Sequence, residues 1–149
     1  MPNRIYRGPV DRQPRTVSDK TVAGAYLPGT FVTEGASALT QATAFAPNLL
    51  LLSDRDYYSL GAMDSNDPLK VAYASGDTGV AYELTPNDRF QAAVAAATYT
   101  YGQELTVGAS GRMVAAVTGN VVVAFARTAG AKSAGDLIDV QVANFYTKP

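Results

Sequence analysis

The sequence predicts an all-β protein, with a compact sandwich or barrel-like body over residues 17–149, an extended N-terminal arm over residues 1–16, and at most one short helix. Three observations lead to this fold class. From Val17 onward, short apolar runs alternate with clusters of Gly, Pro, Asn, Asp and Ser at roughly regular spacing, which is typical of β-rich folds. A length of 149 residues favours a single domain. Residues 1–16 carry three prolines and no periodic apolar pattern, and proline favours extended backbone.

In the first half of the body, the predicted strands follow turn signals. Thr30–Thr33 comes after a Pro-Gly pair, and Leu49–Leu52 comes after Ala-Pro-Asn. The second run is apolar at every position, as expected of a strand buried on both faces. Lys70–Ala74 and Val80–Leu84 flank residues 75–79, which have the composition of a turn, so the two segments are predicted to form a hairpin.

The second half contains the clearest strand patterns. Glu104–Val107 and Arg112–Val117 flank the Gly-containing segment 108–111 and predict another hairpin. Val121–Ala126 follows a Thr-Gly-Asn turn and is predicted as an apolar strand. In Leu137–Ala143 apolar and polar residues alternate, which predicts one buried and one open face. The residues expected on the buried face are Ile138, Val140 and Val142.

Residues 86–97 fit two structures. A threonine, a proline and an aspartate at the start of the segment resemble a helix N-terminus, and Phe90, Ala93, Val94 and Ala97 would form a helical stripe. The same segment also shows period-2 alternation, and it leads into alternating Thr and Tyr residues that are typical of strands. We favour a strand here and keep the helix as the alternative.

The absence of histidine and cysteine from the chain excludes large classes of chemistry. It removes thiolate catalysis, Cys-ligated zinc and every Ser-His or Cys-His arrangement. No phosphate-binding glycine motif occurs. The formal net charge is −1, so no general attraction to nucleic acid is expected. The longest apolar runs have six residues, whereas a membrane-spanning helix needs about 20. We therefore expect no catalytic residues, no cofactor, no metal, no membrane association and no direct contact with nucleic acid.

Three acidic motifs have a chemical and a structural interpretation. Asp77-Thr78-Gly79 resembles the catalytic motif of retroviral-type aspartic proteases, in which two chains share a proton between carboxylates. The same residues make a good turn, which we favour. Asp54 and Asp56 could face one side of a strand and hold a divalent ion. Residues 64–67 begin like a calcium loop, but the continuation lacks the required ligand and glycine. For both we favour solvated loop charges, and a structural calcium ion at the second remains an alternative.

The N-terminal arm differs from the body in charge. Residues 1–20 hold five basic residues against two acidic ones, whereas the rest of the chain holds seven against eleven. The arm is either a frayed terminus or a segment that docks on another surface, and its apolar and aromatic residues favour docking. The nine tyrosines of the chain are typical of interfaces, although we expect at least half of them to be core or sheet residues.

Three segments together resemble capsid cement proteins, also called head decoration proteins, of tailed bacteriophages. They are Asn3–Val10, Ala92–Val107 and Ala134–Ala143, the last being small residues and Gly-Asp followed by an alternating strand. The resemblance extends over nearly the whole chain, and its persuasive part is the order of these segments behind an arm. It implies a small β-rich, non-enzymatic protein that acts as a homotrimer or homodimer on the outside of a capsid built from an HK97-type shell protein.

The predicted function is therefore a decoration protein of the virion. It would be made in the host cytoplasm, bind the outer capsid surface and bridge neighbouring major capsid proteins. The alternatives are another virion component, such as a head–tail connector or tail protein, and the aspartic protease using Asp77. The arm residues predicted to contact the capsid or a neighbouring subunit are Arg4, Ile5, Tyr6, Arg7, Arg12 and Arg15.

Overall fold

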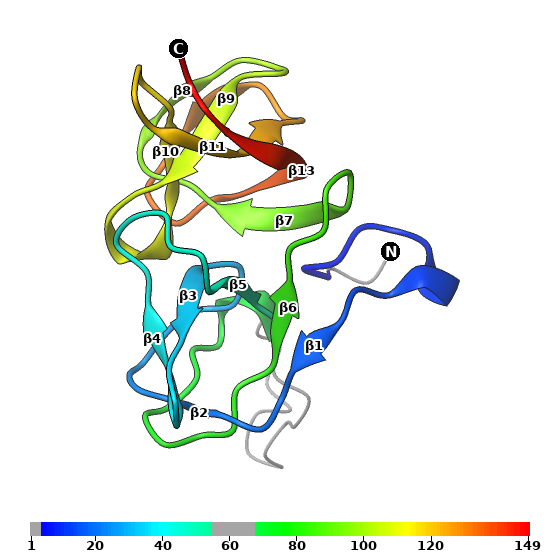
Figure 1. Cartoon of the computed structure of the whole chain (residues 1–149), viewed down its shortest axis with the longest axis vertical. Coiled ribbons are helices and arrows are strands. Elements are labelled where there is room, and N and C mark those ends of the chain that lie inside the picture. The colour runs from blue at the N-terminus through cyan, green and yellow to red at the C-terminus, as the bar shows by residue number, and fades with distance from the viewer. Residues whose placement is uncertain (1–3, 55–67) are drawn as a thin grey trace.

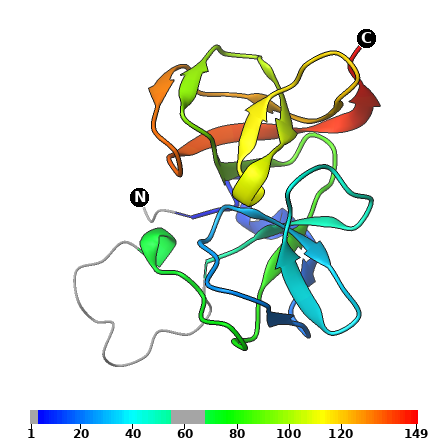
Figure 2. The same ribbon diagram turned by 90° about the vertical axis from the view of Figure 1, so that its left-hand side faces the viewer.

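The computed structural model describes residues 4–54 and 68–149, and the described chain is mainly β. It contains no α-helix within these ranges, only three-residue 3-10 turns at Val10–Arg12 (η1), Pro68–Lys70 (η3) and Ala109–Gly111 (η4). The strands form two lobes that lie one above the other in both views (Figures 1 and 2). The predicted all-β body is confirmed.

The N-terminal lobe is a six-stranded sheet with the order β1-β6-β5-β3-β4-β2. All its pairs are antiparallel except β2 with β4. Its strands are short, at two to four residues each. They are β1 (Thr16–Val17), β2 (Thr21–Val22), β3 (Phe31–Glu34), β4 (Ala38–Gln41), β5 (Leu49–Leu52) and β6 (Ala81–Glu83).

The C-terminal lobe is a five-stranded antiparallel sheet with the order β10-β9-β11-β13-β7. Its two edges meet, because Val94 pairs with Met113 and the Ala95 N–H donates to the Met113 carbonyl at 2.9 Å, so the sheet curls into a small barrel. The strands are β7 (Arg89–Ala93), β9 (Glu104–Val107), β10 (Met113–Ala115), β11 (Val121–Ala126) and β13 (Leu137–Thr147), with β8 (Ala97–Tyr99) and β12 (Gly130–Lys132) as a separate ribbon.

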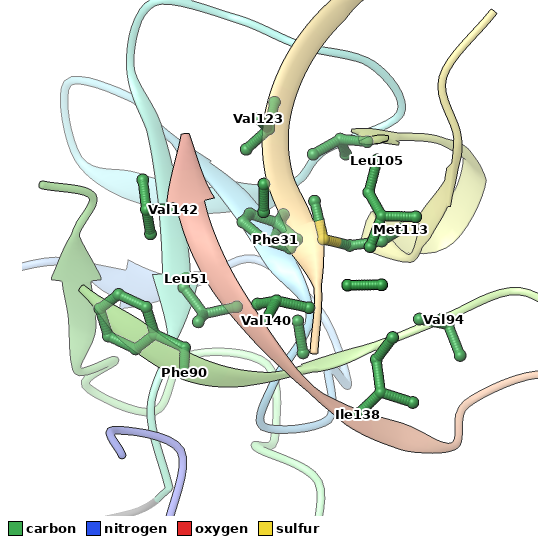
Figure 3. Packing of buried hydrophobic residues seen from close by; sticks show 14 of the residues in the cluster. Phe31, Leu51, Phe90, Val94, Leu105, Met113, Val123, Ile138, Val140 and Val142 are labelled. Carbon is green, nitrogen blue, oxygen red and sulfur yellow. The ribbon is translucent and has the colours of Figure 1, made fainter. Parts of the chain in front are cut away.

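One hydrophobic core joins the two lobes. Phe31 and Leu51 of the N-terminal lobe pack in the same cluster as Leu105, Met113 and Val140 of the barrel (Figure 3). The other face of the N-terminal sheet has a smaller cluster of its own, which includes Val22, Val32, Leu39, Leu50, Leu52, Tyr73 and Ala81. The β5 run is therefore buried on both faces, as its sequence predicts.

Backbone contacts at two glycines fix one lobe on the other. Gly29, with φ +81°, accepts a hydrogen bond from the Ala93 N–H at 2.8 Å. Gly111, with φ +63°, donates to the Ala42 carbonyl at 2.8 Å and lies against the backbone of Phe31. A side chain at Gly111 would require both an unfavourable backbone conformation and space occupied by another strand.

Most strand predictions agree with the structure. Strands β5, β9 and β11 have the predicted bounds, and the hairpin of β9 with β10 forms as expected. The strand interpretation of residues 86–97 is confirmed by β7. In β13 the three predicted inward residues are at most 3% exposed.

The predicted hairpin of residues 70–74 with residues 80–84 is wrong. Both edges of β6 are already occupied, by β5 and β1. Lys70 is the last residue of the 3-10 turn η3, and residues 71–74 are irregular. Tyr73 anchors this segment, because its hydroxyl donates to the Ser53 and Asp54 carbonyls at 2.9 and 3.1 Å. Tyr73 is buried although it lies outside any strand, so its place in the apolar pattern wrongly predicts a strand.

Candidate functional site

The N-terminal arm is folded onto the chain's own barrel. Tyr6 forms an antiparallel bridge with Phe90 of β7. The Gln91 N–H donates to the Ile5 carbonyl at 2.6 Å, and the Arg7 N–H donates to the Arg89 carbonyl at 2.9 Å. The arm, dark blue in Figure 1, thereby covers the edge of β7, which would otherwise present unpaired backbone groups.

The side chains of Ile5 and Tyr6 are buried in this arrangement. Ile5 is 0% and Tyr6 8% exposed. The Tyr6 ring packs against Tyr82 and Phe90 at centroid distances of 6.1 and 5.6 Å, so it joins both lobes. Its hydroxyl donates to the Arg12 carbonyl at 2.8 Å, and burial raises the pKa of the phenol. Both side chains thus have their contacts within the chain, against β7, and a further contact of Ile5 and Tyr6 with the capsid or a neighbouring subunit stays a prediction.

The arginines of the arm are placed differently. Arg4, Arg12 and Arg15 are exposed. Arg7 pairs with Asp139 of β13, with 3.3 Å between Nε and Oδ1. Near them Val10 is 76% exposed, which is unusual for a large apolar side chain. A contact of these four arginines with a partner stays a prediction, whereas the structure assigns the two apolar arm residues to the fold.

A second group of residues, half-buried or exposed, lies on the outside of the barrel. Glu104, Phe125 and Gln141 are direct cross-strand neighbours on β9, β11 and β13. Their chain neighbours Leu105, Ala124 and Val140 point into the barrel, so these three point outward. Phe125 is half-buried over a small cluster of Ala116, Val122 and Ala143.

Polar and aromatic contacts extend this group on both sides. The Phe125 and Tyr146 rings lie 6.4 Å apart, and the Tyr146 hydroxyl donates to Glu104. Arg127 donates two hydrogen bonds to Gln141, at 3.1 and 3.0 Å, and its guanidinium lies 5.2 Å from the centre of the Tyr101 ring. We call this connected set the aromatic row: Tyr101, Glu104, Phe125, Arg127, Gln141, Tyr146 and Lys148.

Glu104 is the electrostatic centre of one end of the aromatic row. The Lys148 ammonium lies 2.7 Å from its carboxylate. Hydrogen bonds from Lys148 and Tyr146 lower the pKa of Glu104, and the same carboxylate raises the pKa of Tyr146. Charge-assisted hydrogen bonds of this kind favour one arrangement of the Glu104, Tyr146 and Lys148 side chains.

Much of the exposed apolar area belongs to this lobe. Tyr101 is 67%, Val117 64%, Phe145 40% and Tyr146 37% exposed. The number of tyrosines in the sequence points to an interface, but it does not say which of them lie on the surface. Tyr6, Tyr73 and Tyr99 are buried, so the tyrosines divide between core and surface.

Of the three acidic motifs, the described residues contain Asp54 and the Asp77 motif. One oxygen of the Asp77 carboxylate accepts from the Ala74 N–H at 2.9 Å, as the turn interpretation predicts. The calcium-loop motif at 64–67 and Asp56 lie outside the described residues. In residues 4–54 and 68–149, no group of three or more His, Cys, Asp or Glu could hold a metal ion, and no helix there has the length and apolarity to cross a membrane.

Known proteins show no family for this chain. No protein-family model and no curated protein matches the chain. Among solved structures it is similar to the N-terminal base of the head fiber protein gp8.5 of bacteriophage phi29. The match has 15% sequence identity and a TM-score of 0.45, and it covers 91% of this chain and 95% of that one. Because both values are low, this likeness carries no argument for the function of the chain.

Proposed function

We propose that the chain is a non-enzymatic decoration protein that binds the outer surface of an HK97-type phage capsid and bridges neighbouring major capsid proteins, as a homodimer or homotrimer. The observation that carries the proposal is the aromatic row, which offers a contact surface on a rigid barrel. The resemblance of Asn3–Val10, Ala92–Val107 and Ala134–Ala143 to cement proteins gives the class of partner.

The aromatic row has the features of a protein contact surface. Tyrosine and arginine are enriched at interfaces because they provide large contact areas and directional polar groups. Hydrogen bonds within the row hold the arginine and tyrosine side chains in place. A surface that is ordered before binding loses less side-chain entropy in the complex. Small contacts of this kind reach useful strength when symmetry repeats them over a shell.

Arg4, Arg12 and Arg15 are exposed, which favours a partner whose contact surface is acidic. Such contacts are screened by salt, since the Debye length is about 8 Å at physiological ionic strength. Binding through these arginines is therefore expected to weaken as salt rises, while contacts of the aromatic row are expected to persist.

The test is binding of the purified chain to expanded capsid shells of its phage, measured by co-sedimentation and by copy number per shell. We expect hundreds of copies per shell. Tyr101→Ala is expected to reduce binding about tenfold, because it removes a large exposed aromatic contact area from the row. A combined Arg4→Gln, Arg12→Gln and Arg15→Gln variant is expected to reduce the salt dependence. Lys132→Gln, on the separate ribbon, is the matched control.

Copy number also separates this proposal from the other virion roles. A single ring of copies at one vertex would indicate a connector or tail protein and contradict decoration. Absence of binding to expanded shells would contradict both the capsid partner and the bridging role. Deletion of the arm is not a suitable test, because Ile5 and Tyr6 are part of the core.

A further inference from the structure

A cleft of about 510 Å³ lies between the two lobes, away from the aromatic row. One wall comes from residues 25–30 and Gln41 of the N-terminal lobe, and the other from Ser110, Arg112 and residues 135–137 of the barrel. Gln91 and Ala93 of β7, together with Leu69 and Lys70 of η3, complete the lining. This volume is in the range of binding clefts for small ligands or a few amino-acid residues.

The cleft is preformed because lobe contacts hold both of its walls. The Ala93 N–H donates to the Gly29 carbonyl at 2.8 Å, which fixes the loop that carries Leu27 and Pro28. On the other wall, the Gly111 N–H donates to the Ala42 carbonyl at 2.8 Å and fixes the turn that carries Ser110 and Arg112. A ligand entering this space does not have to order the backbone around it.

Within residues 4–54 and 68–149, neither of the two positive charges of the cleft has a side-chain partner. Arg112 is half-buried and its guanidinium makes no hydrogen bond or ion pair within the described chain. The Lys70 ammonium likewise has none there. Asp136 also lines the cleft, but it is exposed, it makes no ion pair with Arg112, and its carboxylate accepts from the Ser133 N–H at 2.8 Å. A partly desolvated guanidinium without a counter-charge is unfavourable, and a carboxylate would satisfy it.

The rest of the lining is apolar or matches peptide groups. Leu27, with 39% exposure, is one of the few large apolar side chains of the lobe that stay open to solvent, and Leu137 is half-buried beside Gly29. Gln41 carries an amide, which both donates and accepts hydrogen bonds as a peptide group does. The cleft therefore combines two positive charges with apolar contacts and an amide.

We propose that this cleft binds a short acidic peptide segment of a partner protein, with a Glu or Asp carboxylate on Arg112 and Lys70 and an adjacent apolar side chain against Leu27 and Leu137. The proposal goes beyond the capsid role, since the cleft is separate from the aromatic row and needs no shell for its test. A peptide is favoured over a small acid because the cleft provides apolar and amide contacts beside the charges.

The test is titration of the ¹⁵N-labelled chain with two blocked peptides, acetyl-Ala-Leu-Glu-Leu-Ala-amide and its Gln counterpart, and with N-acetylglutamate as the small acid. We expect chemical-shift changes around Ala93, Ser110 and Arg112 with the Glu peptide. Affinity for the Gln peptide is expected to be about tenfold lower, the size of one charge-assisted hydrogen bond. N-acetylglutamate keeps the carboxylate but lacks the apolar side chains, so it is expected to bind more weakly than the Glu peptide.

Two charge variants and a control complete the design. Arg112→Gln and Lys70→Gln are each expected to reduce the preference for Glu over Gln, and Lys70 is exposed, so its replacement does not endanger folding. Arg89→Gln removes an exposed charge outside the cleft and is expected to leave binding unchanged. Equal binding of the two peptides, shifts elsewhere on the chain, equal binding of N-acetylglutamate, or no shifts at millimolar peptide would overturn the proposal.

Discussion

The two sheets of this chain differ in how many of their faces are buried. In the N-terminal lobe, one face of β5 packs into the core shared with the barrel and the other into a separate cluster, so Leu49–Leu52 are all 5% exposed or less. In the barrel, the inner face is filled, while the outer face carries Phe125 and Tyr146 in partial contact with solvent. The N-terminal lobe therefore serves mainly the stability of the fold, and the barrel exposes the surface suited to contacts.

Strand length gives a physical reason for this division. The N-terminal strands have two to four residues, so each forms few ladder hydrogen bonds, and a sheet of such strands depends on burial. The barrel contains β13, with 11 residues, which pairs with both β11 and β7. The longer ladder lets the barrel keep one face open.

The largest effect is expected from replacing the aromatic residue of the N-terminal lobe that enters the shared core. Phe31 is 1% exposed and packs among barrel residues (Figure 3). Phe31→Ala is expected to lower the free energy of unfolding by about 3–5 kcal/mol, because it removes a large buried ring and leaves a cavity. Chemical denaturation followed by circular dichroism measures this loss, and the two lobes are expected to unfold in one transition.

Phe125→Ala is the matched change on the open face of the barrel. Its ring is only half-buried, so a loss of about 1 kcal/mol is expected. Equal losses for the two variants would show that the outer cluster is as important for stability as the shared core. Two separate transitions in the Phe31→Ala variant would show that each lobe has a core of its own.

An intermediate effect is expected at the junction between the lobes. In Gly111→Ala, the new Cβ would meet the Phe31 backbone, whose amide nitrogen lies 2.9 Å away, in addition to the strain of φ +63°. We expect a loss of about 2–3 kcal/mol, above the roughly 1–2 kcal/mol of the left-handed conformation alone. Gly119→Ala, at φ +88° with nothing within 4 Å, measures that strain by itself. If the two variants lose the same stability, the packing at Gly111 contributes nothing.

The sequence predicts the barrel better than the N-terminal lobe, because the two lobes differ in strand length and in the number of buried faces. Alternation in Leu137–Ala143 reports one buried and one open face, which a local pattern can encode. The arrangement of β1, β2 and β6 depends on partners far away in the chain, and strands of two or three residues carry no period. Tyr73 gives a misleading strand signal, because it is buried in an irregular segment where its hydroxyl makes a hydrogen bond, and not in a strand.

The candidate surfaces show a similar limit. The apolar and aromatic residues of the arm favour a segment that docks on another surface, but residue types alone do not say that Ile5 and Tyr6 pack on β7 of the same chain. Residues of the aromatic row come from β9, β11 and β13 and are far apart in the sequence, so no contiguous motif predicts the row. The cleft between the lobes likewise depends on tertiary contacts at Gly29 and Gly111.

The smallest effect is expected on the open face itself, at Glu104. Hydrogen bonds from Lys148 and Tyr146 lower its pKa in the folded chain, so this carboxylate stabilises the fold above its ordinary pKa of 4.5. That contribution is lost as the pH falls through the lower folded value. Glu104 also raises the pKa of Tyr146, and that contribution is present below pH 10 and lost as the pH rises through the raised value.

Glu104→Gln is therefore expected to lower the melting temperature slightly at pH 7 and to approach the parent chain at both acid and alkaline ends of a pH series. Glu83→Gln, at a half-buried carboxylate of the N-terminal lobe, is the control. Its melting temperature is expected not to approach that of the parent chain at alkaline pH. If the melting temperatures of the parent chain and Glu104→Gln differ by the same amount at every pH, the Lys148 and Tyr146 contacts do not order the open face. The order of the aromatic row would then have to come from Phe125 packing alone.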